Sequence, residues 1–250
     1  MENREVRLNK YLARCGIASR RECDKIIASG KISINGDRVT ELGVKVTESD
    51  IVKYNGEVVT PASGKEYYAY NKYVGTVVTA SDPHGRETVY DAIKSVEKKD
   101  ISHLKYIGRL DMNSEGLLLF TNDGDLIHAL THPKFHIKKV YDVKIDKELK
   151  KEEIEKMVNV GILDEDQLLR AGSVKRIENV SGYIYSVELY EGKNRQIRRM
   201  FNHFGYKVLK LKRMQFSSVK LRDLSIGRIR TLTEREVLSL KNRGFKKFKS

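Results

Sequence analysis

The alternation of apolar and polar positions predicts helices and short strands along the whole chain. In residues 1–60, apolar positions at helical spacing predict a helix that ends at Gly16. Ser19, followed three positions later by Glu22, has the pattern of a capping box and predicts the start of a second helix. Asn-Gly pairs at residues 35–36 and 55–56 each predict a tight turn between two strands. We therefore expect a helix pair followed by small hairpins.

The longer remainder of the chain contains both strand and helix periods. Residues 117–120 are an apolar run of the length of a buried strand, and residues 138–145 alternate between apolar and polar positions. Apolar residues at helical spacing predict an amphipathic helix at residues 197–204, ended by Gly205. Further elements are expected as strands at residues 67–78, on either side of Asn71-Lys72, and 183–190, and as helices at residues 88–96, 128–131 and 150–158.

A break in this pattern divides the chain into two parts. Residues 60–65 contain Pro61, Ser63 and Gly64 and have no apolar period, which is typical of a linker. We expect a small domain at residues 1–60, a linker at 61–65, a larger domain at 66–240 and a basic tail at 241–250.

Composition and charge indicate a partner that is a polyanion. The 250 residues include 48 Lys and Arg against 34 Asp and Glu, for a formal charge of +14 and a pI of about 9.6. Nucleic acid is the commonest such partner, and no basic amphipathic helix with an aromatic face favours a membrane surface. Two cysteines, Cys15 and Cys23, are too few for a disulfide framework, and the first residues lack an apolar signal segment. We therefore expect a soluble, cytoplasmic protein that binds nucleic acid.

One polar loop carries the best candidate for chemistry. Asp111 lies in a Gly-bounded loop directly before the apolar run, where packing can fix a carboxylate that still reaches solvent. Arg109, two positions earlier, supplies a cation that does not deprotonate. The simpler interpretation of this pattern is a surface ion pair or a turn, and the loop alone does not decide between the two.

A second candidate segment begins the predicted helix at residues 197–204. Residues 193–213 contain eight Lys and Arg and no Asp or Glu. Basic side chains at the start of a helix oppose its dipole, so local stability does not explain them, whereas an anionic ligand would. The alternative is a basic face that only contacts solvent.

The first part of the chain resembles the alpha-L RNA-binding domain. The resemblance covers residues 5–52 and rests on the segment RLNKYLARCGIASRRECDKIIASGKISINGDRV. It implies binding of structured RNA, mainly through phosphate contacts made by basic side chains of the helix pair. These are Arg7, Lys10, Arg14, Arg20, Arg21 and Lys25. Without the resemblance, they would equally suit solvated helix faces.

Over residues 5–240 the chain resembles the RsuA/RluB family of ribosomal RNA pseudouridine synthases. Three segments carry this resemblance together: Gly-Arg-Leu-Asp before an apolar strand, Lys-x-Tyr on a strand, and Gly-x-x-x-Gln-Ile-Arg before a basic helix. The segments SDPHGRETVYDAI and LLLFTNDGDL favour the branch that acts on the large ribosomal subunit. The resemblance implies an α+β fold, with a mixed, mostly antiparallel sheet, flanking helices and a cleft across the sheet.

The resemblance also implies roles for individual residues. The catalytic aspartate of the family falls on Asp111, the aromatic residue that stacks on the target uracil falls on Tyr141, and the basic residue that pairs with the aspartate falls on Arg198. Arg109 matches an arginine that helps to displace the target base. Arg195 stands where many relatives have His. It stays open which of Lys193, Arg195 and Arg198 contacts substrate phosphate, and Arg199 is expected to bind substrate as well.

The implied reaction needs no cofactor and no metal. It is an isomerisation that breaks the N1–C1′ bond of uridine and joins C5 to C1′, and a carboxylate can attack C1′ or abstract the 2′ proton. The expected partner is ribosomal RNA, 23S rather than 16S, or a ribosomal assembly intermediate, and a monomer is expected. Three alternatives stay open: a non-catalytic ribosome assembly factor, a synthase acting on 16S RNA, and a nucleoside hydrolase.

Overall fold

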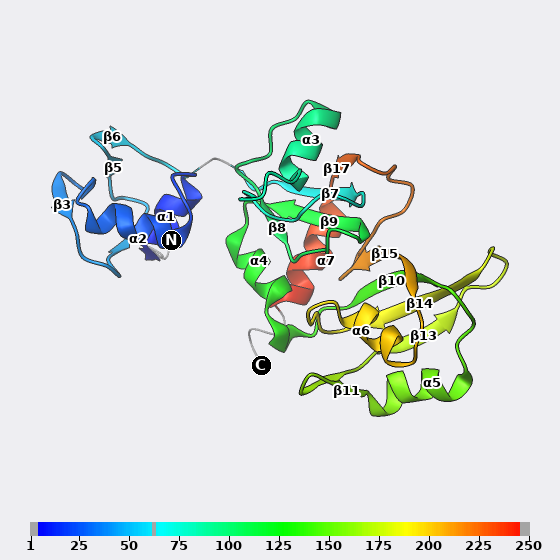
Figure 1. Ribbon diagram of the computed structural model, residues 1–250. Coiled ribbons are helices and arrows are strands. Elements are labelled where there is room, and N and C mark those ends of the chain that lie inside the picture. The colour runs from blue at the N-terminus through cyan, green and yellow to red at the C-terminus, as the bar shows by residue number, and fades with distance from the viewer. Residues whose placement is uncertain (1–4, 62–63, 246–250) are drawn as a thin grey trace. The chain divides into compact units, whose positions relative to one another are not determined.

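The computed structural model describes residues 5–61 and 64–245 of the chain. It contains two compact units, which divide between Lys65 and Glu66 and are described separately below (Figure 1). We call them the N-terminal unit and the C-terminal unit.

The N-terminal unit is a helix pair with short strands, as the sequence predicted. Its core contains buried apolar residues of both helices and of the first hairpin, among them Leu12, Cys23 and Ile32. The Ser19 side chain accepts a hydrogen bond from the Glu22 amide at 3.3 Å, but the Glu22 carboxylate pairs with Lys25 at 3.0 Å instead of completing the capping box. The elements are β1 (Val6–Arg7), α1 (Leu8–Arg14), α2 (Arg20–Ala28), β2 (Ile32–Ile34), β3 (Asp37–Val39), β4 (Lys45–Val46), β5 (Val52–Tyr54) and β6 (Glu57–Val58).

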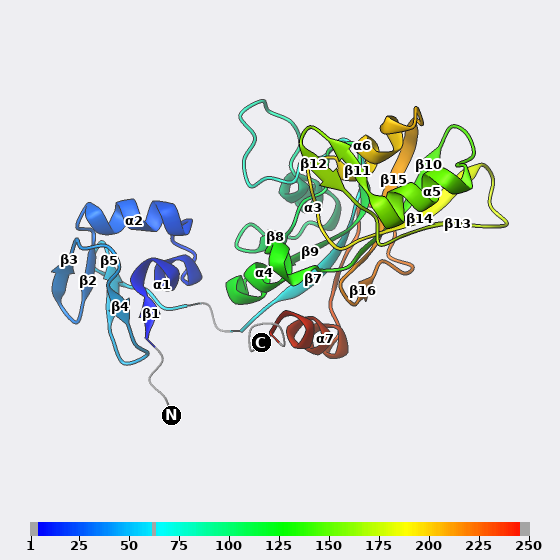
Figure 2. The same cartoon turned by 90° about the horizontal axis from the view of Figure 1, so that it is seen from below.

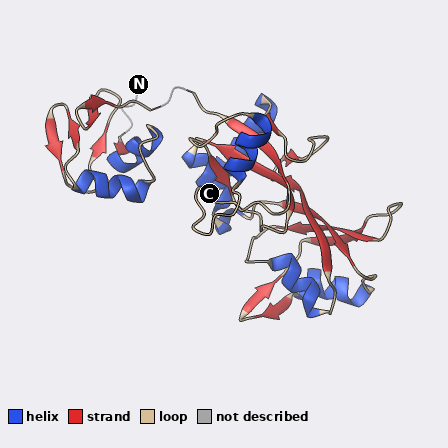
Figure 3. Cartoon of the chain, turned by 45° about the horizontal axis from the view of Figure 1, so that its top comes forward, coloured by secondary structure: helices blue, strands red, loops and turns tan. Residues whose placement is uncertain are grey.

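The C-terminal unit is built on one large sheet, which runs through it as a continuous twisted band (Figure 3). The strand order is β13-β14-β10-β15-β9-β7-β17, with β8 and β16 paired to β9 and β15. Among the described residues, β15 and β9 are the parallel neighbours in this sheet, so the predicted mixed, mostly antiparallel α+β fold is confirmed. Its strands are β7 (Tyr67–Lys72), β8 (Lys105–Ile107), β9 (Glu115–Thr121), β10 (Lys139–Ile145), β13 (Ser173–Arg176), β14 (Tyr183–Leu189), β15 (Val208–Phe216), β16 (Val219–Lys220) and β17 (Ile229–Thr231).

Helices cover both faces of this sheet (Figure 2). On one face, α3 (Val89–Glu97) and α6 (Gln196–His203) pack on one set of strand residues, and on the other face α4 (Gly124–Thr131) and α7 (Glu234–Phe245) pack on the alternate set. Neighbouring residues of β9 therefore enter different cores, which is why residues 117–120 are a continuous apolar run. The smaller elements are η1 (Pro133–Phe135), α5 (Lys151–Glu155), η2 (Lys156–Val160), β11 (Ile162–Asp164) and β12 (Gln167–Leu169).

Two expectations about the ends of elements were wrong. The chain does not turn at Asn71-Lys72, because both residues belong to β7 and are buried in the sheet. The expected basic tail also begins too early, since α7 continues through Phe245 and the Lys241 ammonium lies 5.3 Å from the centre of the Tyr67 ring. Residues 246–250 lie outside the described part of the chain.

A single glycine permits the parallel contact between β9 and β15. Gly116 has a φ of +105°, and a Cβ atom there would lie 2.4 Å from the backbone oxygen of Arg213. No other residue type fits this approach. The contact brings the loop before β9, which carries Asp111, beside Arg213 on β15.

Candidate active site

Asp111 and Tyr141 line one cavity of about 640 Å³ in the C-terminal unit. Its wall is formed by the loop at residues 108–114, the start of β10, the end of β15 and the segment at residues 189–197. The strand β10 has the predicted alternation, with Tyr141, Val143 and Ile145 buried on one face. Residues far apart in sequence thus line one cavity.

The Asp111 carboxylate is partly exposed in this cavity. The loop turns through a hydrogen bond from the Ser114 amide to the Asp111 carbonyl at 3.0 Å. Within residues 5–61 and 64–245, no hydrogen bond or ion pair is made to the carboxylate itself. It is therefore available to a substrate.

A buried lysine that the sequence patterns did not single out fixes this loop through hydrogen bonds to its backbone. Lys72 is fully buried on β7, and its ammonium donates to the carbonyls of Ser114 at 2.9 Å, Tyr73 at 3.0 Å and Met112 at 3.3 Å. Burial lowers the pKa of Lys72 to about 8, although the charges of Asp111 and Glu115 oppose this shift. The sequence signal that would have identified it is a lysine at the end of a predicted strand rich in aromatic residues.

Arg198 was expected to pair with Asp111, and the structure shows a different arrangement. Its guanidinium donates to the Asn113 carbonyl at 2.7 Å and to the Val208 carbonyl at 3.0 Å, and no ion pair with Asp111 forms. Burial and the charge of Arg195 lower the pKa of Arg198, whereas the charge of Asp111 opposes them. Arg198 thus fixes the position of the loop and adds positive potential near its carboxylate.

Arg213 is a second cation that the sequence patterns did not assign. It is 1% exposed, and Nε donates to the Leu117 carbonyl at 2.7 Å while Nη1 donates to the Arg109 carbonyl at 3.2 Å. Arg213 is the cross-strand neighbour of Tyr141, which is 9% exposed. Both residues line the cavity.

The remaining basic candidates divide into two groups. Arg109 and Arg195 are exposed and line the cavity. Lys193 also lines it, but its ammonium pairs with Glu191 at 2.9 Å and donates to the Leu168 carbonyl. Arg199, expected to contact substrate, does not line the cavity. Its side chain is 15% exposed and binds Asp164 through Nε at 2.5 Å.

Gln196, the glutamine of the third motif, organises the segment before α6. Its amide nitrogen donates to Glu191 at 2.7 Å and to the Arg170 carbonyl at 3.1 Å, and its oxygen accepts from the Lys193 amide at 3.2 Å. Arg195 follows in the left-handed region with a φ of +47°, at the N-cap of α6. From this position Arg195 lines the cavity.

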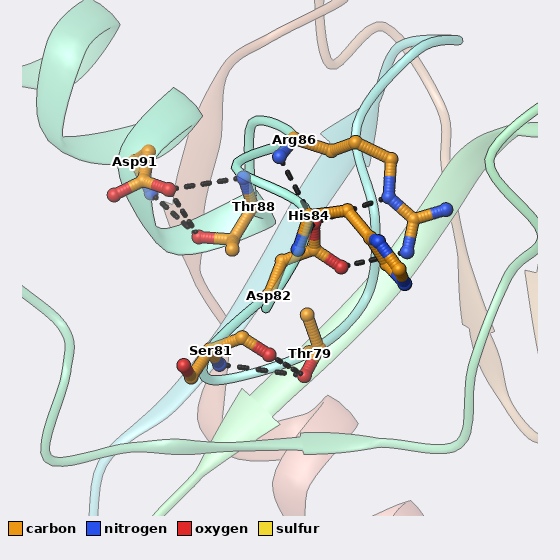
Figure 4. A network of polar contacts seen from close by, with 7 residues as sticks. All are labelled: Thr79, Ser81, Asp82, His84, Arg86, Thr88 and Asp91. Atoms are coloured by element: carbon orange, nitrogen blue, oxygen red, sulfur yellow. Dashed lines mark hydrogen bonds and ion pairs between the residues drawn. The ribbon is translucent and has the colours of Figure 1, made fainter.

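A second loop contains an aspartate and an arginine that bind each other (Figure 4), and its Arg86 lines the same cavity. Asp82 accepts four hydrogen bonds: from the amides of His84 at 3.2 Å and Arg86 at 2.9 Å, and from Arg86 Nε at 3.1 Å and Nη2 at 2.7 Å. These bonds hold the pKa of Asp82 well below its usual range, the Arg86 side chain being the largest cause. Arg86 and Asp111 thus line the same cavity, but only Asp82 is bound by its neighbouring arginine.

The basic residues of the N-terminal unit lie mostly on its surface. Lys10 is half-buried, and the others are exposed, namely Arg7, Arg14, Arg20, Arg21 and Lys25. A hydrogen bond from Asn9 to Asp24 at 2.8 Å joins α1 to α2. The helix pair thus presents cations on a fixed scaffold.

Neither a metal cluster nor a membrane span is found where the structure is described. No group of three or more His, Cys, Asp or Glu side chains in residues 5–61 and 64–245 has the geometry to hold a metal ion. No described helix is both long and apolar enough to cross a membrane.

Both units are similar to known proteins. The family profile described as RNA pseudouridylate synthase matches residues 66–203, and the profile of the S4 domain matches residues 6–52. Ribosomal large subunit pseudouridine synthase B of Bacillus subtilis (strain 168) is 38% identical over 94% of this chain and 95% of its own length. The dual-specificity RNA pseudouridine synthase RluF of Escherichia coli (strain K12) is 36% identical over 94% of this chain and 78% of its own length. A crystal structure of a pseudouridylate synthase matches with a TM-score of 0.66 and 28% identity, over 94% of this chain and 99% of that one.

Proposed function

This chain belongs to the RNA pseudouridylate synthase family, as its motifs predicted, and we propose that it isomerises one uridine of 23S ribosomal RNA with Asp111 as catalytic carboxylate. The activity on ribosomal RNA follows from the relatives that match nearly the whole chain. The preference for 23S RNA is supported by the relative named for the large subunit, which matches 94% of this chain and 95% of its own length. A monomer working in the cytoplasm, on free RNA or on an assembly intermediate, is part of the proposal.

The observation that carries the assignment of Asp111 is that its carboxylate, in the cavity that Tyr141 also lines, has no partner among the residues the structure describes. Isomerisation breaks the N1–C1′ bond, with the electron pair leaving on the base. The base then turns, C5 bonds to C1′, C5 loses its proton and N1 gains one. Asp111 either attacks C1′ or removes the 2′ proton, and both routes require an ionised carboxylate close to the sugar.

Tyr141 and the free cations supply binding around this carboxylate. The Tyr141 ring gives a flat face on which the uracil stacks, and its hydroxyl can relay the proton that leaves C5 by passing on its own proton as it accepts that one. Arg109 and Arg195 are exposed at the cavity, so we assign to them the displaced base and the backbone phosphates next to the target. The target nucleotide must leave its helix to reach Asp111, as for other enzymes that act on a base.

The test of this function is tritium release from ribosomal RNA labelled at uridine C5. The wild-type protein should release tritium from unmodified 23S RNA and not from 16S RNA, and mapping should find one new pseudouridine. Release from 16S RNA alone would overturn the subunit assignment. Binding of RNA without any release would favour the alternative, a non-catalytic assembly factor.

We assign RNA anchoring to the N-terminal unit because its exposed cations lie on a rigid helix pair. Replacing Arg20 and Arg21 by Gln should reduce the slope of log affinity against log salt by roughly one per lost phosphate contact. The single-turnover rate at saturating RNA should not change. Lys45→Gln is the matched control, because Lys45 pairs with Glu5 at 2.8 Å and is not on the helix pair. An unchanged slope in the double variant would exclude these two residues as phosphate contacts.

A further inference from the structure

Two neighbouring cations on the cavity wall have no carboxylate partner in the described part of the chain. Lys139 donates to the carbonyls of Ile137 at 3.2 Å and Glu191 at 3.4 Å, which are long for hydrogen bonds from an ammonium. Arg213 is almost fully buried and uses Nε and Nη1 on backbone carbonyls, but Nη2 is buried without any hydrogen-bond partner. The nearest acid, Glu191, is taken by Lys193 and Gln196.

This arrangement destabilises the fold, because Arg213 is buried and Lys139 beside it is half-buried. A buried cation needs an opposite charge or a full set of hydrogen bonds, and two adjacent cations also repel each other. Burial and the charge of Arg213 lower the pKa of Lys139 to about 8, with Glu191 acting in the opposite direction. The structure therefore contains two incompletely satisfied cations that an electron-rich ligand in the cavity would satisfy.

The position of Lys139 and Arg213 relative to Tyr141 indicates that they would contact the base of a bound nucleotide. Lys139 and Tyr141 are two residues apart on β10, so both project from the same face of the strand, and Arg213 lies opposite Tyr141 on β15. All three line the cavity together with Asp111. Both cations approach the ring of Phe216, with Arg213 5.1 Å and Lys139 5.8 Å from its centre. A base stacked on Tyr141 thus has its edge within reach of this pair.

We propose that Lys139 and Arg213 bind the carbonyl oxygens of the target uracil and stabilise the negative charge that the base acquires when it leaves the sugar. The proposal rests on the function proposed above and assigns the part of that site that receives the base. When N1–C1′ breaks, the electron pair moves to N1 and is delocalised onto O2 and O4. The Lys139 ammonium and the free Nη2 of Arg213 donate hydrogen bonds to these oxygens without giving up a proton. Such preorganised donors lower the barrier because they bind the charged base more tightly than the neutral one.

The experiment compares Lys139→Met with the matched control Lys138→Met. Lys138 is the adjacent lysine, does not line the cavity and pairs with Glu188. Single-turnover rates and RNA affinity are measured on RNA that carries uridine, 2-thiouridine or 4-thiouridine at the target position. On uridine, Lys139→Met should reduce the rate by about 100-fold, which is the usual effect of removing one donor to a developing negative charge. Its RNA affinity should stay unchanged, and Lys138→Met should behave as the wild type.

The thiouridine RNAs test contact with the carbonyl oxygens directly. Sulfur is a poorer hydrogen-bond acceptor than oxygen, so the ratio of wild-type to Lys139→Met rates should decrease sharply on at least one of the two thiouridine RNAs. An equal ratio on all three RNAs would overturn the proposal. A loss of affinity with a shallower salt slope and an unchanged rate would also overturn it, because that result indicates a phosphate contact.

Arg213→Lys provides a second measurement, with a thermal melt to show that the variant folds. The lysine variant retains the positive charge but loses the planar guanidinium, which binds two backbone carbonyls and still has a nitrogen left to donate to a ligand. A folded variant should have a reduced single-turnover rate with unchanged RNA affinity, and a wild-type rate would remove Arg213 from the proposal. If the wild-type protein binds RNA but converts no uridine, the proposed function fails, and this inference fails with it. Normal wild-type turnover together with full activity of Lys139→Met defeats only the inference.

Discussion

The two loops beside the cavity contain the same pair of residue types and use them in opposite ways. In the loop at residues 81–86, the Asp82 carboxylate is 4% exposed and accepts four hydrogen bonds, three of them from Arg86. In the loop at residues 108–114, the Asp111 carboxylate is partly exposed and has no partner among the described residues, although Arg109 is two positions away. One acid maintains the shape of its own loop, and the other is left accessible to a substrate.

The difference arises from what holds each loop. Asp82 closes its loop from within, through backbone amides and the Arg86 side chain. The Asp111 loop is held from outside, because Lys72, Arg198 and Arg213 donate to its carbonyls and to those of the adjoining strand. Cations bound to carbonyls keep their positive potential near the acid without neutralising it in an ion pair. A loop can therefore be rigid while its carboxylate stays free.

The strongest test of this comparison is the same substitution in both loops. Asp111→Asn should reduce the single-turnover rate by on the order of 10⁴-fold, as expected for loss of a reacting group, with little effect on folding or RNA affinity. Asp82→Asn should keep a readily measurable rate, since that carboxylate acts only on its own loop. Tritium release from ribosomal RNA measures both. Comparable losses in the two variants would show that the comparison is wrong.

Glu115, four positions after Asp111, is a poorer control than Asp82. It begins β9, is buried, and pairs with Lys210 at 3.1 Å. Glu115→Gln should therefore change stability as well as the loop, and Asp82→Asn is the better matched substitution.

Arg198→Lys distinguishes positioning of the loop from a direct pair with Asp111. Lysine keeps the charge but cannot bind the Asn113 and Val208 carbonyls with a planar fork. We expect the rate to decrease by roughly 10- to 100-fold with KM nearly unchanged, because a small misplacement of a reacting group has an effect of that size. Near-wild-type activity would indicate that charge alone matters and would restore the direct pairing predicted from the sequence.

Lys72→Met removes the buried cation that donates hydrogen bonds to carbonyls of the Asp111 loop. Three carbonyls would lose their donor, so the free energy of unfolding should decrease by about 2–4 kcal/mol, less the gain from no longer burying a charge. Denaturant unfolding at neutral pH measures this change. An unaltered midpoint would mean that solvent or the chain satisfies these carbonyls without the lysine.

The smallest effect concerns the pH dependence of Asp82. Its pKa is lower in the folded state than the usual value near 4, so its contribution to stability is complete above that pH and is lost as the pH falls through the folded-state pKa. The wild-type protein should therefore melt at a higher temperature than Asp82→Asn at pH 7, and the difference should shrink as the pH falls below about 4. A constant difference between pH 7 and pH 3 would contradict this linkage.

Local sequence patterns were sufficient to predict several parts of this molecule. Alternation placed Tyr141 on the buried face of β10, and the apolar run after Asp111 identified β9 and hence the loop at its start. Asn-Gly turns and the Ser19 cap predicted the N-terminal unit. These features depend on spacings of a few residues, which the backbone geometry of helices, strands and turns converts directly into position.

The partners of the cations were decided only by the tertiary structure. Arg198 and Arg199 are adjacent on one helix, yet one supports the Asp111 loop and the other binds Asp164 outside the cavity. The Arg198 contact with Asn113 spans 85 positions, and that of Arg213 with Leu117 spans 96. The sequence shows that a long cationic side chain is present, but its bonding partner depends on which carbonyl the folded chain brings within 3 Å of it. For Arg213, that distance is set by the pairing of β9 with β15, and Gly116 allows the two backbones to approach closely enough.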